Sequence, residues 1–394
     1  SPPWNEASPK LARTGTPEIG YDRVLDNFTT FQNEVLDFDE FINLCRETGC
    51  EPVVVVAADE YLTEYTQPAS ITGRDGLIEN AAEWVRYSNI KRNYGVKYWM
   101  IGNECWHQNN VNSNAVIYAN DVVDFSKAMK KIDPSIAIIP NGNTREYCET
   151  VLDIAGNYID YFCISNYPVF KYQAGYASYR DTLQDLMGPV NSALSAIKNK
   201  GLDNRIKLIV SEYGAFDWAG SWPMVNDLGH TLCNFEITGE QLLQNAVEFS
   251  CFWNTRWINN DSVENEVWDA LDKNGHFNAT GFGLMIWGNY LGNKMIATSS
   301  TQHIKSFASK DTDQNILWIY MINKKEQDSR VQLQIESGRV KDVVFCGQLS
   351  GTGPQDVNPE WKKNIRLNRQ MLKSLTLPGV SITVIGLKIK PSET

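Results

Sequence analysis

Two glutamates each come directly after an apolar run that is typical of a buried strand. Glu104 closes the stretch Trp99-Met-Ile-Gly-Asn-Glu104, and Glu212 closes Leu208-Ile-Val-Ser-Glu212. Two carboxyl groups that lie close together can take different catalytic roles, because one stays ionised while burial and its neighbour's charge keep the other protonated. Cleavage of a glycosidic bond needs both forms: the protonated carboxyl group gives its proton to the leaving oxygen, and the ionised one attacks the anomeric carbon. The pair therefore predicts a site for glycosidic bond cleavage.

Polar side chains beside these two glutamates are candidates for substrate binding. Asn103 precedes Glu104, and its amide can hydrogen-bond a sugar 2-hydroxyl, a contact that strengthens in the transition state. Asn166 and Tyr167 end the strand that precedes the Glu212 unit. A tyrosine hydroxyl near a nucleophilic carboxylate can hold its geometry and tune its pKa, whereas the alternative for Tyr167 is a core tyrosine with a satisfied hydroxyl.

The chain is rich in large aromatic residues, with 12 Trp and 17 Tyr. Aromatic rings fill protein cores, and they also stack on the C–H faces of sugar rings. Trp106, two residues after Glu104, is a candidate sugar platform, and Trp218 and Trp253 are similar candidates. Core packing is the alternative interpretation for each of the three.

Charge and composition exclude several classes of partner. Lys and Arg number 36 against 47 Asp and Glu, so the net charge is −11. Nucleic acids and anionic membranes need clustered positive charge, and no apolar run reaches the length of a membrane span. We therefore expect a neutral carbohydrate as partner, with no nucleic acid and no membrane. The sequence leaves open whether the chain is a monomer or a homo-oligomer.

The cysteines and histidines do not form a metal pattern. The eight cysteines are scattered, no CxxC motif occurs, and the four histidines lie far apart. The sequence predicts no metal and no organic cofactor. Unpaired cysteines favour a reducing compartment such as the cytoplasm, although the localisation is not determined by the sequence.

Residues 38–253 alternate between helical patterns and short apolar runs. Helices are predicted over 38–48, 76–92, 115–131, 147–156, 180–199 and 239–247. Strands are predicted over 51–57, 98–102, 136–140, 159–165, 206–211 and 249–253. Repeated βα units indicate an open doubly wound sheet or a closed (β/α)8 barrel, and the absence of a GxGxxG turn together with polar residues at several strand ends favours the barrel.

Two barrel strands are missing from this count. Residues 1–37 contain no convincing buried strand, so the first two βα units are predicted to be absent and the chain to be a processed or trimmed piece of a longer protein. From about residue 282 partial alternation predicts strands over 316–322, 331–335, 340–345, 371–377 and 380–389. The predicted fold is therefore α/β, with an N-terminally incomplete (β/α)8 TIM barrel over 1–281 and a small antiparallel β-sandwich over 282–394.

The stretch from Tyr94 to Glu104, Tyr-Gly-Val-Lys-Tyr-Trp-Met-Ile-Gly-Asn-Glu, resembles the acid/base strand of clan A retaining glycoside hydrolases. It is most similar to that of the family 51 α-L-arabinofuranosidases. The resemblance is good over about residues 38–140, is thinner to about 215, and returns only as general architecture at Leu377–Val384. It implies that Glu104 is the general acid/base on the fourth strand, that Glu212 is the nucleophile on the seventh, and that Val53–Val56 is the third strand.

The chain departs from that family at the expected walls of the site. Asn166-Tyr167 stands where a His-x-Tyr-like pair is usual, Ser-Glu-Tyr-Gly surrounds Glu212, and the loop after Glu104 differs. These differences leave the substrate open: the resemblance implies an arabinofuranosidase-like enzyme, and the alternative is an endo-acting clan A glycanase of the β-glucanase, xylanase or agarase type. A non-catalytic carbohydrate-binding barrel is the alternative from another class. An enzyme for phosphorylated metabolites is disfavoured, since no phosphate-binding glycine loop is present.

Overall fold

The computed structural model describes residues 38–58, 73–107, 114–169, 171–182, 185–256, 267–336 and 338–390. The chain divides into two compact units, which are considered one at a time. The first unit runs over Ser1–Ser165, Pro189–Ser211 and Ala246–Ser250, and the second over Asn166–Gly188, Glu212–Asn245 and Cys251–Thr394. The predicted absence of two βα units concerns residues 1–37, which lie outside the described residues.

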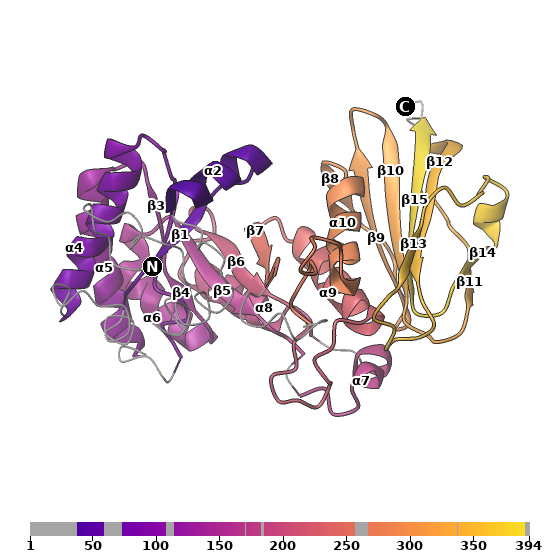
Figure 1. Ribbon diagram of the computed structural model, residues 1–394, viewed down its shortest axis with the longest axis horizontal. Helices are drawn as coiled ribbons and strands as arrows, with labels where there is room; N and C mark the ends of the chain where they lie inside the picture. The colour runs from indigo at the N-terminus through magenta and orange to yellow at the C-terminus, as the bar shows by residue number, and fades with distance from the viewer. Residues whose placement is uncertain are drawn as a thin grey trace. The chain divides into compact units, whose positions relative to one another are not determined.

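Short apolar runs form parallel strands in the first part of the chain (Figure 1). The strands are β1 (Val53–Val56), β2 (Tyr98–Ile101), β3 (Ala137–Ile139), β4 (Asn141–Gly142), β5 (Tyr161–Asn166), β6 (Lys207–Tyr213) and β7 (Val247–Phe252). Hydrogen bonding joins them in the orders β1-β2-β3 and β4-β5-β6-β7. The pairs β1–β2, β2–β3 and β4–β5 are parallel. All six predicted strands are thus confirmed in position.

The two sheets meet at Pro140, between β3 and β4. Proline has no backbone N–H, so it interrupts a strand ladder. Hydrogen bonds nevertheless continue past it, from Asp160 N to Ile138 O at 3.0 Å and from Cys163 N to Pro140 O at 2.9 Å. Strands β3 and β4 are therefore two parts of one strand that Pro140 interrupts. Each described strand from β1 to β7 lies next to the strand that follows it in the chain.

Helices follow the strands, and four of the six predicted ones lie where expected. These are α2 (Phe38–Thr48), α4 (Gly73–Val85) with its π-helical extension η3 (Arg86–Lys91), α5 (Ala115–Ile132) and α6 (Arg145–Ala155), which is followed by the short η4 (Gly156–Tyr158). In α2, the side chains of Phe38, Ile42 and Cys45 are buried, as the helical spacing predicts. The apolar stripe of such a helix packs onto the sheet.

The prediction of one helix over 180–199 was wrong. The structure has α7 (Tyr176–Asp181) and α8 (Gly188–Asn199) instead. Pro189 lies in the first turn of α8, where its missing N–H costs nothing, whereas inside a helix it would remove a hydrogen bond and clash with the preceding turn.

The helix predicted over 239–247 is displaced toward the amino terminus. The structure has α9 (Leu228–Leu242), and β7 already begins at Val247. The start signal is Asp227, whose side chain accepts a hydrogen bond from His230 N at 2.9 Å. A carboxylate in this capping position satisfies one of the first N–H groups of a helix, which otherwise lack partners.

The carboxyl-terminal part forms the predicted antiparallel sandwich. One sheet has the order β13-β12-β15-β10-β9-β8, and the other pairs β11 with β14. The strands are β8 (Lys294–Ile296), β9 (Ile304–Asp311), β10 (Ile316–Asn323), β11 (Ser329–Val331), β12 (Arg339–Ser350), β13 (Glu360–Lys362), β14 (Leu375–Leu377) and β15 (Ser381–Lys390). The predicted strand over 371–377 is divided into the 3-10 turn η5 (Met371–Lys373) and β14, and of the strand predicted over 331–335 only Val331 lies in a strand, β11. Figure 1 shows the long strands β9, β10, β12 and β15 side by side.

Both faces of β10 are covered, because successive side chains of a strand point to opposite sides. Leu317, Ile319 and Met321 pack in the sandwich core with Leu375 and Leu377. On the other face, Tyr320 packs against Trp287 of α10 (Ala279–Tyr290), with ring centroids 4.3 Å apart. The predicted domain boundary between residues 281 and 282 falls inside α10 and stays a prediction.

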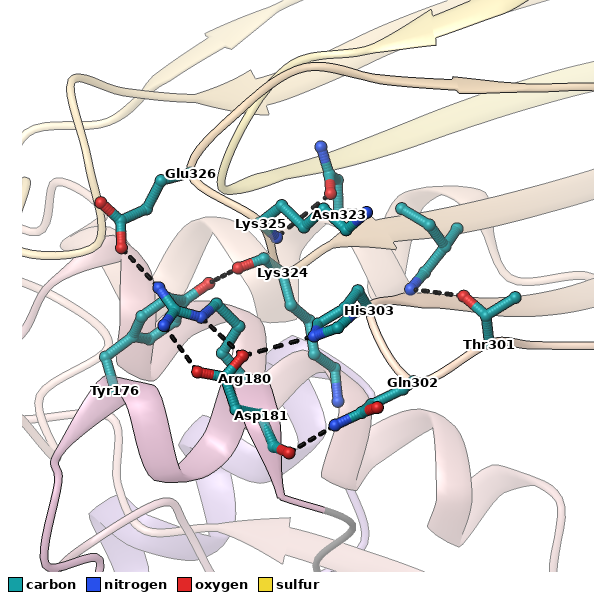
Figure 2. Close-up of polar contacts among 11 residues, drawn as sticks. Tyr176, Arg180, Asp181, Thr301, Gln302, His303, Asn323, Lys324, Lys325 and Glu326 are labelled. Atoms are coloured by element: carbon teal, nitrogen blue, oxygen red, sulfur yellow. Dashed lines mark hydrogen bonds and ion pairs between the residues drawn. The ribbon is translucent and has the colours of Figure 1, made fainter.

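A polar network joins α7 to the turns of the sandwich within the second unit (Figure 2). Arg180 donates to Glu326 Oε1 at 2.6 Å and to both carboxylate oxygens of Asp181 at 2.8 and 2.6 Å. The Tyr176 hydroxyl donates to Lys324 O at 2.7 Å, and His303 Nε2 lies 3.3 Å from Asp181 Oδ1. These contacts fasten α7, which is only six residues long, to the turn that follows β10 and to His303, which directly precedes β9.

Two further observations bear on the cellular setting. Every one of the eight cysteines is described, and all are free thiols. Of the helices in the described part of the chain, none has both the length and the apolar character that a membrane crossing requires.

Candidate functional site

Glu104 lies in a tight turn directly after β2. Gly102 and Glu104 both have positive φ angles, of 64° and 46°. A Cβ atom on Gly102 would lie 2.3 Å from Cys105 Sγ and 3.0 Å from Ala58 Cβ, so only glycine fits there. A non-glycine residue with positive φ costs free energy, and such positions concentrate at functional sites. The half-buried Glu104 is therefore held in a conformation that needs support from its surroundings.

Asn141 supplies that support from β4. Its Oδ1 accepts a hydrogen bond from Cys105 N at 2.8 Å. Its Nδ2 lies within hydrogen-bonding distance of Ile101 O at 3.0 Å, Gly102 O at 3.1 Å and the Tyr118 hydroxyl at 2.9 Å. The side chain thus spans the whole turn that carries Glu104.

Tyr118 of α5 completes this buried network. Its hydroxyl donates to Ile101 O at 2.7 Å and accepts from Asn141 N at 2.9 Å. Burial raises the pKa of the Tyr118 phenol well above its usual value, so the hydroxyl stays a donor. In the sequence, nothing beyond its place at the end of a predicted strand distinguished Asn141, and no local signal pointed to Tyr118, which lies in the first turn of α5.

The other two residues predicted around Glu104 are half-buried. Asn103 lies in the turn itself. The rings of Trp106 and His107 meet edge to face, with centroids 5.7 Å apart. The indole Nε1 of Trp106 is buried and has no hydrogen-bond partner among the described residues. Roles of Asn103 and Trp106 in substrate binding stay predictions.

Glu212 lies near the carboxyl end of β6 and contacts Tyr167, which follows β5. The Tyr167 hydroxyl donates to Glu212 Oε2 at 2.6 Å. A hydrogen bond from a hydroxyl to a carboxylate is charge-assisted, and it is shorter and stronger than a bond between neutral groups. These two sequence-predicted residues, 45 positions apart in the chain, are thus brought together within the second unit.

Asn166 and Trp253 flank this pair. The Asn166 side chain is fully buried, and its Nδ2 donates to Leu186 O at 3.2 Å, while its Oδ1 has no partner among the described residues. Trp253 follows β7, is half-buried, and its backbone N donates to Tyr213 O at 3.1 Å. Their predicted contacts with a substrate stay predictions.

An aromatic cluster surrounds Tyr167 in the second unit. The Tyr167 ring lies 5.5 Å from the ring of Phe216 and 5.7 Å from that of Trp218, and it is perpendicular to Trp218. Trp218 in turn stacks on Trp268, with centroids 6.0 Å apart and an interplanar angle of 14°. Phe216 and Trp268 carried no distinguishing signal in the sequence, since any aromatic residue in a loop is compatible with plain core packing.

Asp217 holds the loop that carries Trp218. Its Oδ1 accepts hydrogen bonds from Lys171 N and Ala219 N, and its Oδ2 from Tyr172 N and Trp222 N, all between 2.9 and 3.0 Å. Burial by itself raises the pKa of the Asp217 carboxyl, but these backbone N–H donors outweigh burial and hold the pKa below its usual value. Asp217 is a structural carboxylate that the sequence did not distinguish from a surface acid.

The two glutamates belong to different units. Glu104, Asn103 and Trp106 lie in the first, whereas Glu212 and its neighbours lie in the second. Convergence of the two carboxylates therefore stays a prediction. In the described part of the chain, no group of three or more His, Cys, Asp or Glu side chains is arranged to hold a metal ion.

Comparison with known proteins agrees with the resemblance found in the sequence. Residues 9–184 match the family model described as "Alpha-L-arabinofuranosidase 1 domain". The chain is 30% identical over 117 residues to α-L-arabinofuranosidase C of Emericella nidulans, a stretch that covers 26% of this chain and 20% of that protein. It is 28% identical over 182 residues to the intracellular exo-α-(1→5)-L-arabinofuranosidase of Acetivibrio thermocellus, covering 41% of this chain and 34% of the relative. The matched stretches thus span about a fifth to a third of these relatives.

Structural similarity extends much further along the chain. The arabinose complex of α-L-arabinofuranosidase from Thermotoga maritima superposes with a TM-score of 0.67, covering 89% of this chain and 78% of that one at 19% identity. At this identity the likeness establishes the fold, a TIM-type barrel with a β-sandwich. The resemblance to clan A glycoside hydrolases, and within them to the family 51 arabinofuranosidases, is confirmed.

Proposed function

We propose that the chain is a retaining glycoside hydrolase of the α-L-arabinofuranosidase type, with Glu212 as nucleophile and Glu104 as general acid and base. The observation that carries the proposal is the 2.6 Å hydrogen bond from the Tyr167 hydroxyl to Glu212 Oε2 near the end of β6. An O–H donor holds a carboxylate in one orientation and favours its ionised form, which is the form that attacks an anomeric carbon.

The turn around Glu104 supports the second role. Three hydrogen bonds of the Asn141 side chain, with Cys105 N, Ile101 O and Gly102 O, brace residues 101–105 and keep the Glu104 backbone in its left-handed conformation. A general acid must meet the leaving oxygen in a defined geometry, so a braced turn suits it better than a mobile loop. In TIM barrels the carboxyl ends of different strands contribute to one active site, which supports the convergence of the ends of β2 and β6.

The proposed reaction has two steps. In the first, an oxygen of Glu212 bonds to the anomeric carbon while the bond to the leaving oxygen breaks, and that oxygen takes the proton of Glu104. In the second, Glu104 takes a proton from water, the water oxygen bonds to the anomeric carbon, and Glu212 leaves as a carboxylate. Two inversions at one carbon give net retention of configuration.

The proposed substrates are α-L-arabinofuranosides of plant or algal polysaccharides and oligosaccharides. The names of the similar proteins support the sugar. A net charge of −11 fits neutral sugars, which need no electrostatic steering. A panel of aryl glycosides and polymeric arabinan, xylan, β-glucan and agar separates this substrate from those of an endo-acting glycanase.

The two glutamate roles are tested by replacing each residue and adding azide. On an activated aryl α-L-arabinofuranoside, Glu212→Ala lowers kcat about 10⁴-fold or more, because no covalent intermediate forms. Glu104→Ala still forms the intermediate when the leaving group needs no acid, and azide then replaces water in the second step. The Glu104→Ala product is therefore a glycosyl azide with the configuration of the substrate, which NMR identifies.

Glu83→Gln is the matched control, because this glutamate lies on α4 in an ion pair with Arg86 whose two side chains are 42% and 43% exposed. It leaves kcat unchanged, since exposed ion pairs contribute little. Normal turnover by Glu212→Ala, or a retained azide product from it, contradicts the nucleophile assignment. Wild-type protein that binds oligosaccharides in calorimetry and hydrolyses none of the panel contradicts the enzyme and favours the non-catalytic barrel.

A further inference from the structure

A strongly basic segment lies at one edge of the sandwich, in a chain whose net charge is −11. Between Trp361 and Thr376 the sequence has five basic residues and no acidic one. All five are exposed: Lys362, Lys363, Arg366, Arg369 and Lys373. Like charges that lie close together repel one another, so their grouping opposes folding unless a partner neutralises them. The grouping therefore calls for an explanation.

Four of these five cations have no counter-ion in the described part of the chain. Lys362 pairs with Glu360 at 3.1 Å, and the others form no ion pair with any described residue. We call these four residues the basic edge: Lys363, Arg366, Arg369 and Lys373. Cations of the first unit contrast with them, since Lys200 pairs with Asp153 at 2.6 Å. The basic edge is thus open to an anionic partner from outside the described chain.

The backbone beneath the basic edge is fixed to the sandwich. β13 is the last strand of the six-stranded sheet, and Ile365 N donates to Cys346 O at 3.0 Å, which extends the pairing with β12 beyond the end of β13. Ile365 and Leu367 pack against the sandwich core, and Leu372 is buried in it. Side chains alternate along an extended segment, so Arg366 points away from that core. A fixed backbone lowers the entropic cost of binding, because the cations are already held together.

Polar amides lie between the cations. Asn364, Asn368 and Gln370 are exposed, and amide groups donate hydrogen bonds to hydroxyls and accept hydrogen bonds from them. The segment from Lys362 to Lys373 has no aromatic residue, so it lacks the rings on which the bases of single-stranded nucleic acids stack. Unpaired cations interleaved with amides therefore fit a polymer that carries both carboxylates and hydroxyls.

We propose that the basic edge binds the carboxylates of an acidic polysaccharide, a chain that contains uronic acid residues. The inference goes beyond the proposed function, because none of these residues takes part in the reaction and binding requires no hydrolysis. A guanidinium group pairs with a carboxylate through two parallel hydrogen bonds, and a lysine attracts it as a point charge. The sugar that Glu212 attacks stays neutral. Holding an acidic chain that carries such sugars raises their concentration near the protein.

Binding is measured on the full chain by fluorescence anisotropy with a labelled oligogalacturonate. The wild type binds this probe, and it does not bind the methyl ester of the same probe, which has the same backbone without the charges. Raising the salt concentration from about 20 mM to about 200 mM weakens binding about 10-fold, because salt screens exposed charges. Equal binding of the two probes, or binding of neither, overturns the proposal.

A pair of double variants locates the binding surface. Arg366→Gln with Arg369→Gln raises the Kd for oligogalacturonate about 5- to 20-fold, because two of the four unpaired cations are lost. Lys131→Gln with Lys198→Gln is the matched control, since both lysines are exposed, form no ion pair with any described residue and belong to the first unit. It changes the Kd less than about twofold. Equal effects of the two double variants overturn the proposal, because net charge alone then governs binding.

Two other roles of the cations are separated by the same materials. If the wild type binds a labelled oligothymidylate of equal charge more tightly than oligogalacturonate at the same salt concentration, the partner is a nucleic acid and the proposal is wrong. If the arginine double variant keeps the wild-type Kd and aggregates, the proposal is also wrong, and the cations protect the sheet edge from pairing with another chain.

Failure of the proposed function is distinguished by turnover. Hydrolysis of a neutral aryl α-L-arabinofuranoside is measured in parallel, and both double variants keep the wild-type kcat. A wild type that binds oligogalacturonate and hydrolyses no glycoside contradicts the proposed function and leaves the basic edge standing. A wild type that hydrolyses the arabinofuranoside and does not bind oligogalacturonate contradicts the basic edge alone.

Discussion

At the scale of single residues, the two glutamates of the candidate site differ in what distinguishes them. Glu104 has an unusual backbone conformation, whereas Glu212 has a well-defined hydrogen-bond partner. Glu104 has a φ of 46°, and Glu212 accepts a short hydrogen bond from Tyr167. The sequence predicted both glutamates at strand ends and placed Tyr167 near a nucleophile. It did not predict that Asn141 and Tyr118 brace the Glu104 turn, because that network joins three segments that are far apart in the chain.

The Tyr167 contact leads to a prediction about turnover. Tyr167→Phe keeps the ring and removes the donor, so Glu212 loses a group that orients it, and kcat falls about 10²-fold. Tyr213→Phe is the matched control, because Tyr213 follows Glu212 directly in β6 and its hydroxyl lies 2.9 Å from the Thr238 hydroxyl. It costs about 1 kcal/mol of unfolding free energy and changes kcat less than about threefold. Equal kcat values for the two variants contradict the positioning role of Tyr167.

At the scale of elements, one buried carboxylate organises a loop. Asp217 joins the backbone at Lys171 and Tyr172 to the backbone at Ala219 and Trp222, and so ties the segment after β5 to the segment after β6. The strands themselves were predictable from apolar runs, and α9 would have been predictable from the Asp227 cap. The loop held by Asp217 was not predictable, because any of the many acidic residues in the sequence could accept hydrogen bonds from backbone N–H groups in this way.

Asp217 predicts a specific dependence of stability on pH. Its folded-state pKa lies below its usual value, so the ionised form stabilises the protein above the unfolded-state pKa of about 3.9, and this contribution is lost as pH falls through the folded-state pKa. Asp217→Asn lowers the unfolding free energy at pH 7 by about 1–3 kcal/mol, and the gap from wild type narrows below about pH 4. Urea unfolding of the wild type and of Asp217→Asn, repeated from pH 7 to pH 2, measures the difference in unfolding free energy at each pH.

Asp75→Asn is the control for this experiment, since that side chain is almost fully exposed. It changes the unfolding free energy by less than about 0.5 kcal/mol at either pH. A gap between Asp217→Asn and wild type that stays constant down to pH 2 is the result that contradicts the argument.

At the scale of the whole molecule, the second unit is held together by polar contacts as well as by its core. Lys324, which directly follows β10, pairs with Glu236 of α9 at 2.6 Å, and both side chains are less than one-tenth exposed. The Tyr179 hydroxyl also donates to Glu236 at 2.7 Å. Together with the Arg180 network in Figure 2, this pair connects the sandwich to helices that precede it in the chain: Glu236 lies 88 residues before Lys324, and Arg180 lies 146 residues before Glu326.

Removal of Lys324 is expected to destabilise the second unit strongly. Lys324→Met leaves the Glu236 carboxylate buried without its cation, which costs about 3–5 kcal/mol. Lys305→Met is the matched control, because the Lys305–Glu240 pair is more exposed, at 23% for each side chain, and its loss costs about 1 kcal/mol or less. Thermal or urea unfolding compares the two, and equal losses contradict the claim that burial makes the Lys324 pair important.

The sequence by itself determined the six predicted strands of the parallel sheets, strands β10, β12 and β15 of the sandwich, four of the six predicted helices and the two strand-end glutamates, because apolar periodicity and strand ends are local properties of a chain. It did not determine β8, β9 or β13. Only the tertiary structure decided that Tyr167 bonds to Glu212, that Trp218 stacks on Trp268, and that Lys324 pairs with Glu236. Such contacts join residues from different elements, and which side chains meet depends on how the elements pack, a property that no local pattern encodes.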